Sequence, residues 1–561
     1  MIVRVIPAVR LPHRAAERYD YLVPPDLTPA MTPGSLVIVP FAGRTVPGIV
    51  AEVIEASTIR DPKGIIAFAE GCAGYPSYVP ALWERLAHSF ATTLPRLAWA
   101  ALPWAPARAR ADYAPGPVGR DGQELVMVPT VREAYAWVDE LGGGTVYHAG
   151  LRPGERYRIA CAVSRGEVGR IVGTKSAVFL PFPNLTRVRV LHAGSSSYVQ
   201  EDADPRYDAR VIACELARAS GAAFETSDAL LPLPWYRVGE RMPVSCVVHD
   251  LADAAKRAEQ RVLVAGPLVD ALDRVVGAGG RALILLNRRG ISTGSVCKDC
   301  GSVVLCPGCA IPLSVHEDRA SCTSCERDFP LPGACARCRG TGFKSFSAGS
   351  KALASLLMKR YPGVRLVHLD RDELGDDLGA AQVIVGTSAV FRALPPHPEP
   401  FTLVADAFMG AGTGKAGVWS VEETARSLRT LAGYVAPGGT LHVQTMDTSS
   451  PALRVLSDPD RFVRDELAER AALGYPPARE LVTLLGAGAE HAPLWEEAVA
   501  LAQGVRSRLP EYVTLDPAWG RPKRFRGKFR VSIDLKSPRG KSHHALVQSL
   551  PRGWAAQVRT L

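Results

Sequence analysis

The chain has 561 residues, 47% of them hydrophobic and 22% charged, which is typical of globular protein with room for about three to five domains. Its net charge of +10 and pI of about 9.0 are compatible with a polyanionic partner. Arg4 and Arg10 interrupt the apolar residues at the start, and no later apolar run could span a bilayer, so we expect neither a signal peptide nor a membrane helix. Four cysteines are too scattered for a disulfide framework, which favours a reducing cytoplasm: Cys72, Cys161, Cys214 and Cys246.

Residues 1–103 are expected to form short strands followed by a helix. Residues 104–124 are rich in Pro, Ala, Arg and Gly, a composition typical of a linker. The apolar pattern predicts a helix around residues 81–90, preceded by strands at 2–7, 19–24, 35–41 and 47–53.

From residue 125 onward, apolar runs that resemble buried parallel strands alternate with helix-like runs. This pattern predicts two α/β layers, with a cysteine-rich segment inserted in the second. The final segment, 447–561, has helical stretches followed by a strongly basic, strand-like run. The strands expected in the α/β layers lie at 124–129, 144–150, 170–181, 187–194, 281–290, 365–370, 381–387, 401–406 and 439–445.

Eight cysteines in four Cys-x-x-Cys pairs form the most specific motif of the chain. Each pair can aim two thiolates at one metal ion, and a tetrahedral four-thiolate site needs two pairs, so the motif predicts two zinc ions. The segment has too few large apolar residues for a core of its own, which argues against a cluster of buried or disulfide-bonded cysteines. An iron–sulfur cluster is the other metal-based alternative. The pairs are Cys297/Cys300, Cys306/Cys309, Cys322/Cys325 and Cys335/Cys338.

Several motifs together resemble the PriA family, the bacterial primosomal protein N′, a replication-restart helicase. The strongest is LILLNRRG at 283–290, followed directly by the eight-cysteine module. The resemblance covers nearly the whole chain. Further matches are YDYLVP at 19–24, LVMVPT at 125–130, VYHAGLRPGERY at 146–157, IVGTKSAVFLPFPNL at 171–185, SSYVQEDADPRYDAR at 196–210, LDRDEL at 369–374 and VIVGT at 383–387.

The resemblance implies a multidomain α/β protein with two RecA-like helicase lobes. Its two zinc sites would be nested, one held by Cys297, Cys300, Cys335 and Cys338 and the other by Cys306, Cys309, Cys322 and Cys325. The implied order is a β-rich 3′-end DNA-binding domain at 1–103, the linker at 104–124, a degenerate lobe one at 125–245, lobe two at 246–296 and 339–446, the zinc module at 297–338 inserted in lobe two, and an α+β C-terminal DNA- and partner-binding domain at 447–561.

Three motifs that the family uses for phosphoryl transfer are missing. The linker contains no lysine and stands where a winged-helix domain and the phosphate loop G-x-x-x-x-G-K-[ST] are expected. Leu191-His192-Ala193-Gly194 stands in place of Asp-Glu-Glu-His, which would hold magnesium. Tyr434 and Pro437 occupy the arginine positions of the arginine-finger motif. Because each loss removes stabilisation of the transferring phosphate, we expect no ATP cofactor and no ATP hydrolysis.

The same resemblance implies a pocket for a nascent 3′ end in the N-terminal domain. Asp20 would accept a hydrogen bond from the terminal 3′-hydroxyl, and Tyr19 would pack against the last base. The alternative is that both residues only shape a strand and a turn. Lys175, Arg288 and Arg289 either contact the DNA backbone or have structural roles.

The run at 521–541 is the most basic stretch, and Trp519, Phe525 and Phe529 interleave with its charges. Such spacing suits a surface that follows phosphates and stacks on bases, whereas the alternative is a solvated strand face with its phenylalanines in the core. We expect a mixture, with alternate residues buried. Arg530 matches a family arginine that would hold the acidic tail of single-stranded DNA-binding protein. The aromatic pair that the family places in its N-terminal helix is not evident, and His88 and Thr92 lie near the expected places. The expected DNA contacts are Arg521, Lys523, Arg524, Arg526 and Lys528.

We therefore interpret the chain as a zinc-containing, cytoplasmic and nucleoid-associated pseudohelicase of bacteria. It would bind abandoned forks and recruit single-stranded DNA-binding protein and primosome or helicase-loading proteins, with no membrane partner. Two rival functions remain. One is an active ATP-dependent 3′–5′ DNA helicase with an unconventional nucleotide site, and the other is a zinc-dependent protein adapter without DNA binding.

Overall fold

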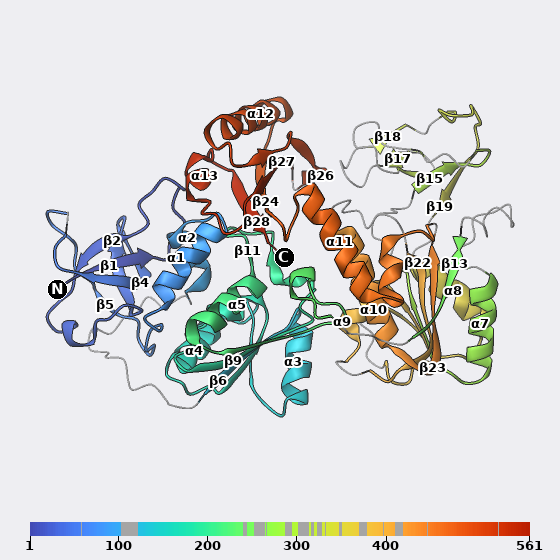
Figure 1. Ribbon diagram of the computed structural model, residues 1–561, viewed down its shortest axis with the longest axis horizontal. Coiled ribbons are helices and arrows are strands. Elements are labelled where there is room, and N and C mark those ends of the chain that lie inside the picture. Colours follow the sequence, from blue (N-terminus) through green and yellow to red (C-terminus); the bar gives the residue numbers. More distant parts are fainter. Residues whose placement is uncertain are drawn as a thin grey trace.

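The chain forms a row of units, each built on its own β-sheet, as the computed structural model in Figure 1 shows. The N-terminal unit lies at one end of the row and the second parallel sheet lies toward the other end, with the C-terminal unit above the middle. None of the helices described combines the length and apolar character that crossing a bilayer requires. The structure describes residues 1–560 apart from 58, 103–121, 239–243, 252–263, 265, 287–293, 301–303, 305–312, 316–318, 322–327, 331–332, 347–349, 370–377, 396–397, 410–418, 446 and 526.

The N-terminal unit is a five-stranded antiparallel sheet with strand order β2-β1-β4-β3-β5. Helices α1 (Val79–Ser89) and α2 (Leu94–Ala101) cover one face. In α1 the buried residues recur every three or four positions, as an amphipathic helix requires. The expected helix and the four expected strands of this segment are therefore confirmed. The strands are β1 (Ile2–Pro7), β2 (Tyr19–Leu22), β3 (Leu36–Phe41), β4 (Arg44–Ile54) and β5 (Ala67–Phe68).

The next unit is an all-parallel sheet with strand order β12-β9-β6-β8-β7. Helix α3 (Val131–Glu140) packs on one face, and α4 (Pro153–Ser164) and α5 (Ala209–Ser220) pack on the other. A short antiparallel pair, β10 (Val199–Gln200) and β11 (Tyr207–Asp208), precedes α5. The parallel strands are β6 (Gln123–Met127), β7 (Thr145–Tyr147), β8 (Arg170–Gly173), β9 (Leu185–Leu191) and β12 (Ala223–Ser227).

One prediction for this sheet is wrong. The strand expected over 170–181 ends at Gly173, and residues Lys175–Phe179 form a 3-10 helix instead. Ala177, Val178 and Phe179 are all buried in succession. A strand turns successive side chains to opposite faces, so the tight helical turn is what places all three in one core.

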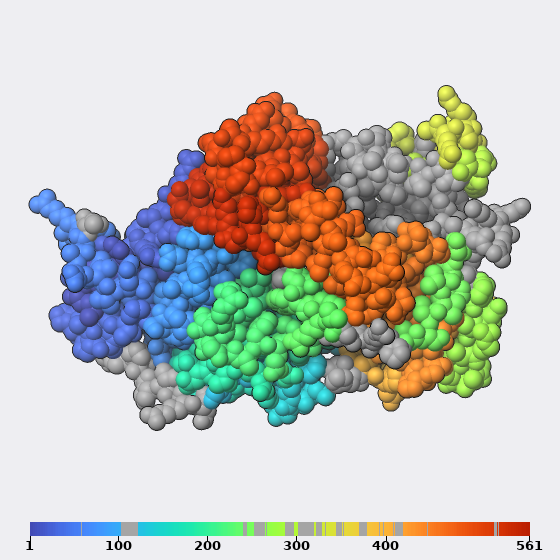
Figure 2. Space-filling view, viewed as in Figure 1, coloured from blue at the N-terminus to red at the C-terminus, as the bar shows by residue number. Residues whose placement is uncertain are grey.

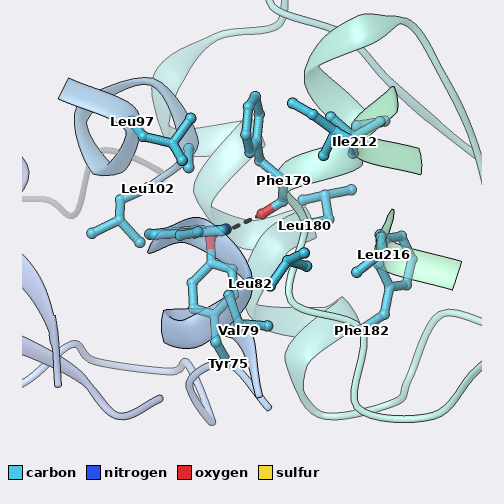
Figure 3. Packing of buried hydrophobic residues seen from close by; sticks show 14 of the residues in the cluster. Tyr75, Val79, Leu82, Leu97, Leu102, Phe179, Leu180, Phe182, Ile212 and Leu216 are labelled. Carbon is cyan, nitrogen blue, oxygen red and sulfur yellow. Dashed lines mark hydrogen bonds between the residues drawn. The ribbon is translucent and has the colours of Figure 1, made fainter. Parts of the chain in front are cut away.

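The N-terminal unit and the first parallel sheet share one hydrophobic core. Residues of α1 and α2 contact the 3-10 segment and α5, as Figure 3 shows for Leu82, Phe179 and Ile212. The Tyr75 hydroxyl donates a hydrogen bond of 3.0 Å to the carbonyl oxygen of Phe179 across this boundary. The buried apolar surface and this hydrogen bond both hold the two units in a fixed relation.

The second parallel sheet has six strands in the order β13-β23-β22-β14-β21-β20. Helices α7 (Gly266–Gly277) and α8 (Ser350–Arg360) pack on one face. The other face is covered by α9 (Val390–Ala393), α10 (Ser420–Gly433) and α11 (Pro459–Leu473). The strands are β13 (Ser245–Asp250), β14 (Ala282–Leu285), β20 (Leu366–Leu369), β21 (Val383–Gly386), β22 (Phe401–Met409) and β23 (Val435–Thr445).

The cysteine-rich segment lies in the chain between β14 and α8, and it is therefore an insertion in the second parallel sheet. Strands β15 (Gly294–Cys297) and β19 (Phe343–Phe346) pair antiparallel at its base. Its remaining strands are β16 (Ser314–Val315), β17 (Ala320–Ser321) and β18 (Asp328–Phe329).

The C-terminal unit is an antiparallel sheet with strand order β25-β27-β24-β28, and β26 also pairs with β27. Helix α12 (His491–Arg508) packs on one face and α13 (His544–Ser549) completes the core. Figure 2 shows this unit in contact with both the N-terminal and the second-sheet regions. The strands are β24 (Glu480–Gly488), β25 (Val513–Thr514), β26 (Ala518–Phe525), β27 (Lys528–Ser537) and β28 (Ala555–Arg559).

Candidate functional site

Four of the eight clustered cysteines lie close together. The sulfur atoms of Cys297, Cys300, Cys335 and Cys338 all lie within 4.8 Å of one another. Cys297 Sγ is 3.5 Å from Cys338 Sγ, and Cys300 Sγ is 3.7 Å from Cys335 Sγ. Four thiolates at such distances could hold one metal ion, and they match the tetrahedral sulfur set that zinc prefers.

Local backbone geometry supports this cluster. The pairing of β15 with β19 brings Cys297 toward the last Cys-x-x-Cys pair, Cys335/Cys338. Backbone N–H groups of Cys338 and Arg337 point at the sulfur of Cys335 and lower the pKa of its thiol to about 7. A thiol with a lowered pKa is more readily the thiolate that a metal needs. A Cβ added at Gly340 would lie 1.8 Å from Asp299 Oδ2, so a larger residue there would have to displace the Asp299 carboxylate.

The other predicted zinc ligands, Cys306, Cys309, Cys322 and Cys325, lie outside the described residues. The same is true of Arg288 and Arg289. Lys175 lies in the 3-10 helix after β8, where burial lowers the pKa of its amine and Asp202 and Glu201 oppose that effect.

Asp20, on β2, is nearly buried with 9% of its surface exposed. The register of the first two strands places Arg4 directly opposite, and Arg4 Nε lies 3.2 Å from Asp20 Oδ1. Ser57 Oγ donates a hydrogen bond of 2.7 Å to Asp20 Oδ2. The carboxylate is therefore oriented by two donors, one cationic and one a hydroxyl, and sequence motifs alone indicated neither.

Tyr19 lies beside this carboxylate on the same strand. Its ring packs edge-on against Phe41 with 4.9 Å between the ring centroids, and burial raises the pKa of its hydroxyl. Two further ion pairs surround the site, in which Arg18 reaches Glu52 at 3.5 Å and Glu84 at 2.6 Å. The buried carboxylate and the rim of charge therefore lie together, whereas the Tyr19 ring belongs to the core on the other face of the sheet.

The segment Leu191–Gly194 follows β9 at the carboxyl end of the first parallel sheet, where ligands of open α/β sheets commonly bind. His192 adopts a left-handed backbone with φ of 49°, and its Nδ1 lies 2.9 Å from Glu133 Oε2. Burial lowers the pKa of His192, but the hydrogen bond and charge of Glu133 outweigh it, so the pKa is raised overall. The N–H of Gly194 donates to Asp228 Oδ2 at 2.6 Å.

Helix α10 of the second parallel sheet packs directly on this segment. A Cβ added at Gly194 would lie 1.7 Å from Arg426 Nε, so the guanidinium fills the space beside this glycine. Arg426 Nε donates to the carbonyl oxygen of Leu230 at 3.0 Å, and Arg429 Nε donates to that of Ala229 at 3.0 Å. The two parallel sheets are therefore joined by hydrogen bonds from cationic side chains of α10 to backbone carbonyl oxygens.

A buried ion-pair network holds Arg426 in place. Its Nη2 lies 2.5 Å from Glu422 Oε1, and Glu422 Oε2 lies 3.0 Å from Arg470 Nη1. Arg470 Nε in turn lies 2.8 Å from Glu466 Oε1.

Tyr434, which directly follows α10, is buried near the same boundary. Burial raises the pKa of its hydroxyl to about 12, and the charges of Glu133 and Asp228 raise it further.

The C-terminal basic run follows the alternation that a strand imposes. On β27, Lys528 and Arg530 line a cavity, whereas Phe529 lies on the other face against the α12 core. Trp519 stacks with His491 at 4.2 Å and with Trp495 at 4.9 Å between ring centroids, so its ring already has partners within the unit.

Of the remaining predicted DNA contacts in this run, Arg524 is exposed and its guanidinium lies 5.3 Å from the centroid of the Phe529 ring. Arg521 and Lys523 lie on β26, and the structure describes their backbone only. Arg526 lies outside the described residues. His88 and Thr92, at the places of the missing aromatic pair, lie at the boundary with the C-terminal unit, where the N–H of His543 donates to the carbonyl oxygen of His88 at 3.2 Å.

The cavity has a volume of about 930 Å³ and lies between the polar face of the C-terminal sheet and both parallel-sheet units. Arg559 spans this region, because its guanidinium pairs with Glu201 at 2.5 Å and lies 4.7 Å from the centroid of the Trp419 ring. These contacts join segments far apart in the sequence, so no local motif could have indicated them. Basic and acidic side chains both line the cavity: Arg206, Arg210, Arg426, Lys528, Arg530 and Arg559, and Glu201, Asp202, Asp208, Glu422, Glu423 and Asp534.

Comparison with known proteins identifies the N-terminal unit. Residues 8–103 match the family model of the PriA 3′DNA-binding domain. The resemblance to PriA is confirmed. It extends well beyond the N-terminal unit, because relatives named replication restart protein PriA match most of the chain.

Three of these relatives show the extent of the similarity to PriA. The protein from Bacillus subtilis is 27% identical over 399 residues, covering 63% of this chain and 48% of its own. The one from Treponema pallidum is 24% identical over 482 residues, covering 79% and 71%. The probable PriA of Deinococcus radiodurans is 28% identical over 484 residues, covering 78% and 51%. The chain spans about half the length of the first curated relatives it matches.

Among solved structures, the DUF1998 helicase MrfA bound to DNA matches 61% of this chain and 42% of that chain at 11% identity. The TM-score is 0.32, which is too low to support an argument about this protein.

Proposed function

We propose that this protein is a PriA-like replication-restart factor that binds forked DNA and recruits partner proteins without hydrolysing ATP. The observation that carries the proposal is the match of residues 8–103 to the PriA 3′DNA-binding domain, combined with a buried carboxylate at Asp20. The rest of the chain then provides a scaffold for DNA and partners.

In this proposal Asp20 accepts a hydrogen bond from the 3′-hydroxyl of a nascent strand. Arg4 orients the carboxylate, and the substrate hydroxyl takes the place that Ser57 Oγ holds on Oδ2. Tyr19 packs against the terminal base, which is a contact that any base can make. A 3′-phosphate would bring negative charge against a carboxylate and would be rejected.

The proposed loss of ATP hydrolysis is supported at the segment Leu191–Gly194. The two nearest carboxylates already accept hydrogen bonds at both oxygens, Glu133 from Thr130 and His192 and Asp228 from Gly194 and Leu230. Magnesium bound between the parallel sheets would have to compete with these hydrogen bonds for the same carboxylate oxygens. The contacts of α10 with this segment also favour a fixed arrangement of the two lobes over an ATP-driven cycle.

DNA contacts beyond the 3′ end are proposed for the basic run of the C-terminal unit. Cationic side chains would neutralise phosphates, and binding would weaken steeply with added salt. Arg530 is proposed to hold a carboxylate of the tail of single-stranded DNA-binding protein, and primosome or helicase-loading proteins are the other proposed partners. The proposed DNA contacts of this run are Arg521, Lys523, Arg524, Arg526 and Lys528.

The metal is proposed to be zinc, with two ions per chain. Cys297, Cys300, Cys335 and Cys338 would hold the first, and Cys306, Cys309, Cys322 and Cys325 the second. Zinc in such four-thiolate sites is structural, because metal affinity replaces the small hydrophobic core. The metal-bound segment would then be a rigid surface for partner docking.

The proposed domain division is the one that the PriA resemblance implies. The units at 1–103 and 125–245 are each built on a sheet of their own, and the last sheet begins at Glu480, which supports the division. Helix α11 packs on the second parallel sheet, which argues for a later start of the C-terminal unit than residue 447. Lobe two, at 246–296 and 339–446, would carry the zinc module at 297–338 as an insertion, and 104–124 would be the linker. A bacterial cytoplasm with nucleoid association is the proposed location.

Fluorescence anisotropy on three labelled DNAs at one moderate salt concentration tests this function. The first DNA is a fork with a nascent 3′-hydroxyl at the branch, the second the same fork with a 3′-phosphate, and the third a plain duplex. Preference for the first DNA over both others, without ATP, is expected. Equal weak binding to all three would contradict the proposal and favour a zinc-dependent adapter.

A further inference from the structure

The cavity of about 930 Å³, where the C-terminal unit meets both parallel-sheet units, has the volume of a typical small-ligand site. Its floor is the polar face of the C-terminal sheet. The alternation of a strand explains this face, because Val482, Leu484 and Ala556 belong to the core, whereas Thr483 and Gln557 line the cavity. The floor of the cavity is therefore a sheet whose other face is held by a hydrophobic core.

Gln557, on β28, is a buried amide that lines this floor, with 6% of its surface exposed. The strand register places Thr483 directly opposite, and the hydroxyl of Thr483 donates to Asp534 Oδ1 at 2.7 Å. Within the described part of the chain, Gln557 Nε2 has no hydrogen-bond partner. A buried N–H donor is destabilising unless a ligand or a water accepts its hydrogen bond. Gln557 therefore indicates a ligand that carries an acceptor.

Helix α10 begins at a second wall of the same cavity, where Trp419 is its N-cap residue and Ser420 its first residue. The first N–H groups of a helix have no partner within the helix, and the indole of Trp419 has no acceptor with which to cap them. Arg559, the next residue after Gln557 on the same face of β28, brings this wall to the floor, because its guanidinium lies 4.7 Å from the centroid of the Trp419 ring. A helix N-terminus favours a phosphate.

Arg206, which lies between β10 and β11, forms a third wall and donates from its Nε to the carbonyl oxygen of Glu201 at 3.0 Å. Burial lowers the pKa of its guanidinium, and the charge of Arg530 lowers that pKa further. Nearby carboxylates oppose this effect: Asp204, Asp202 and Glu201. Arg206 and Arg530 come from different units and line one cavity, so an anion bound there would relieve their mutual repulsion.

Acidic side chains of the cavity limit the charge that a ligand can carry. Glu423 and Asp202 line the cavity and would repel a ligand with several negative charges. A nucleotide of a DNA strand carries one phosphate charge, and its base offers hydrogen-bond acceptors. The other acidic side chains are paired within the walls: Glu201 with Arg559, Asp208 with Arg210, Glu422 with Arg426, and Asp534 with Thr483.

We propose that this cavity binds one nucleotide, whose phosphate lies among the cationic side chains and the N-terminus of α10 and whose base accepts a hydrogen bond from Gln557. Two sources have this chemistry, an unpaired nucleotide of a single DNA strand and a free nucleotide. The inference rests on the proposed function only in taking DNA as a ligand of this chain. The Asp20 pocket belongs to the N-terminal unit, so the two sites can be tested and can fail separately.

Fluorescence anisotropy of the full chain tests the site with a short labelled oligothymidylate that ends in a 3′-phosphate. This end is proposed to be rejected by the Asp20 pocket, and single-stranded DNA-binding protein is left out because its tail is proposed to use Arg530. Gln557→Leu should weaken binding about twofold to tenfold, which corresponds to the loss of one neutral hydrogen bond. Arg206→Ala should weaken it about tenfold to a hundredfold, because its hydrogen bond to the phosphate is charged.

Unlabelled thymidine monophosphate, added as a competitor, separates the two sources. Displacement of the oligonucleotide that is weaker in Gln557→Leu than in the natural chain would assign the site to a free nucleotide. Binding of the oligonucleotide that depends on Gln557 but resists the competitor would assign it to a DNA strand.

Two matched variants serve as controls. Gln548→Leu removes an exposed amide from α13, and Arg218→Ala removes an exposed cation from α5, so neither should change the affinity. Gln557→Leu should not lower the thermal unfolding midpoint, because Nε2 has no partner to lose, whereas an amide with a purely structural role would lower it. Equal affinity of the natural chain, Gln557→Leu and Arg206→Ala would overturn the proposal, as would failure of both ligands to bind.

Discussion

The PriA resemblance implies a binding site in two regions of this molecule, one for a DNA 3′ end in the N-terminal sheet and one for a nucleotide between the parallel sheets. The two regions differ in which of the expected residues they contain. The N-terminal sheet keeps Asp20, which is almost buried and is oriented by Arg4 and Ser57. The boundary between the parallel sheets has Leu191–Gly194 where an acidic motif is expected, and Arg426 fills the space beside Gly194. Binding groups are present in the first region, whereas the second is packed with side chains that hold the two sheets together.

The difference lies in how the carboxylates of the two regions are used. A buried carboxylate is costly unless it has partners, and Asp20 keeps a full set of them. In the other region, Glu133 and Asp228 bond to neighbouring residues, and Glu422 forms ion pairs with Arg426 and Arg470. These charged groups bond to other groups of the protein, whereas in a nucleotide site they would be accessible to the ligand.

The largest effect is expected in a third region, the cysteine-rich segment, where four candidate metal ligands lie close together. Cys335→Ser should remove one metal ion per chain. Structural zinc sites bind with about 10–16 kcal/mol of apparent free energy, and a site without one of its thiolates loses a large part of it. Metal analysis and limited proteolysis should show local opening of the cysteine segment while the parallel sheets remain folded. Cys246→Ser is the control, and unchanged metal content in Cys335→Ser would refute the ligand set.

The nested arrangement of the two zinc sites has a separate test. Cys306→Ala should also release one ion per chain, because the inner pairs would share a second metal. If metal content stays at two per chain in this variant, the nested assignment is wrong.

The next effect is expected at Asp20. Asp20→Ala should weaken binding to a fork with a 3′-hydroxyl by about tenfold to a hundredfold, since hydrogen bonds to charged groups contribute roughly 1.5–3 kcal/mol. Anisotropy titrations should show no such loss on the fork with a 3′-phosphate. Asp26→Ala removes an exposed carboxylate from the same unit and is the control. Equal losses on both forks would mean that Asp20 supports folding rather than 3′-end recognition.

A smaller effect is expected from the exposed cations of the C-terminal unit. Arg524→Ala combined with Lys528→Ala should lower DNA affinity, and the slope of log affinity against log salt should decrease by about 0.7–0.9 for each phosphate that the variant no longer neutralises. Arg506→Ala combined with Arg508→Ala removes the same charge from the end of α12 and should change the slope less. An unchanged slope in the first double variant would remove β26 and β27 from the DNA surface.

The smallest effect concerns His192 and depends on pH. Its folded-state pKa is raised by Glu133, so protonation favours folding, and this stability is complete below the ordinary pKa of about 6.5 and is lost as pH rises through the folded-state value. His192→Gln should therefore lower the denaturation midpoint at pH 5.5 and have little effect at pH 8. The difference should stay below about 1 kcal/mol, because 46% of the side chain is exposed. A deficit that grows toward high pH would contradict the pairing.

The sequence predicted the units of the fold well where local patterns decide them. Amphipathic spacing indicated α1, and apolar runs indicated the strands of both parallel sheets except the edge strands β12 and β13, which the sequence analysis missed. The failure at Lys175–Phe179 came from tertiary packing, since three successive buried residues resemble a strand interior until the shared core is known. Among the candidate sites, cysteine spacing predicted metal binding, and the PriA resemblance implied the grouping of Cys297 and Cys300 with Cys335 and Cys338, whose sulfurs lie together.

Contacts between distant segments were beyond the reach of sequence reasoning. The contacts of Ser57 with Asp20 and of Arg426 with Gly194 each join residues whose proximity depends on the assembled fold. No local composition distinguishes these residues from ordinary surface or core positions. Only the strand register, which places Arg4 opposite Asp20, could have been inferred from a hairpin pattern.

The most direct test measures fork binding and phosphate release in the same sample. Anisotropy would follow a fork with a nascent 3′-hydroxyl, with and without magnesium and ATP, while a phosphate sensor reports hydrolysis. We expect the same dissociation constant in both conditions and no phosphate release at saturating fork. Phosphate release that rises with fork occupancy would contradict the account and identify an active ATP-dependent helicase.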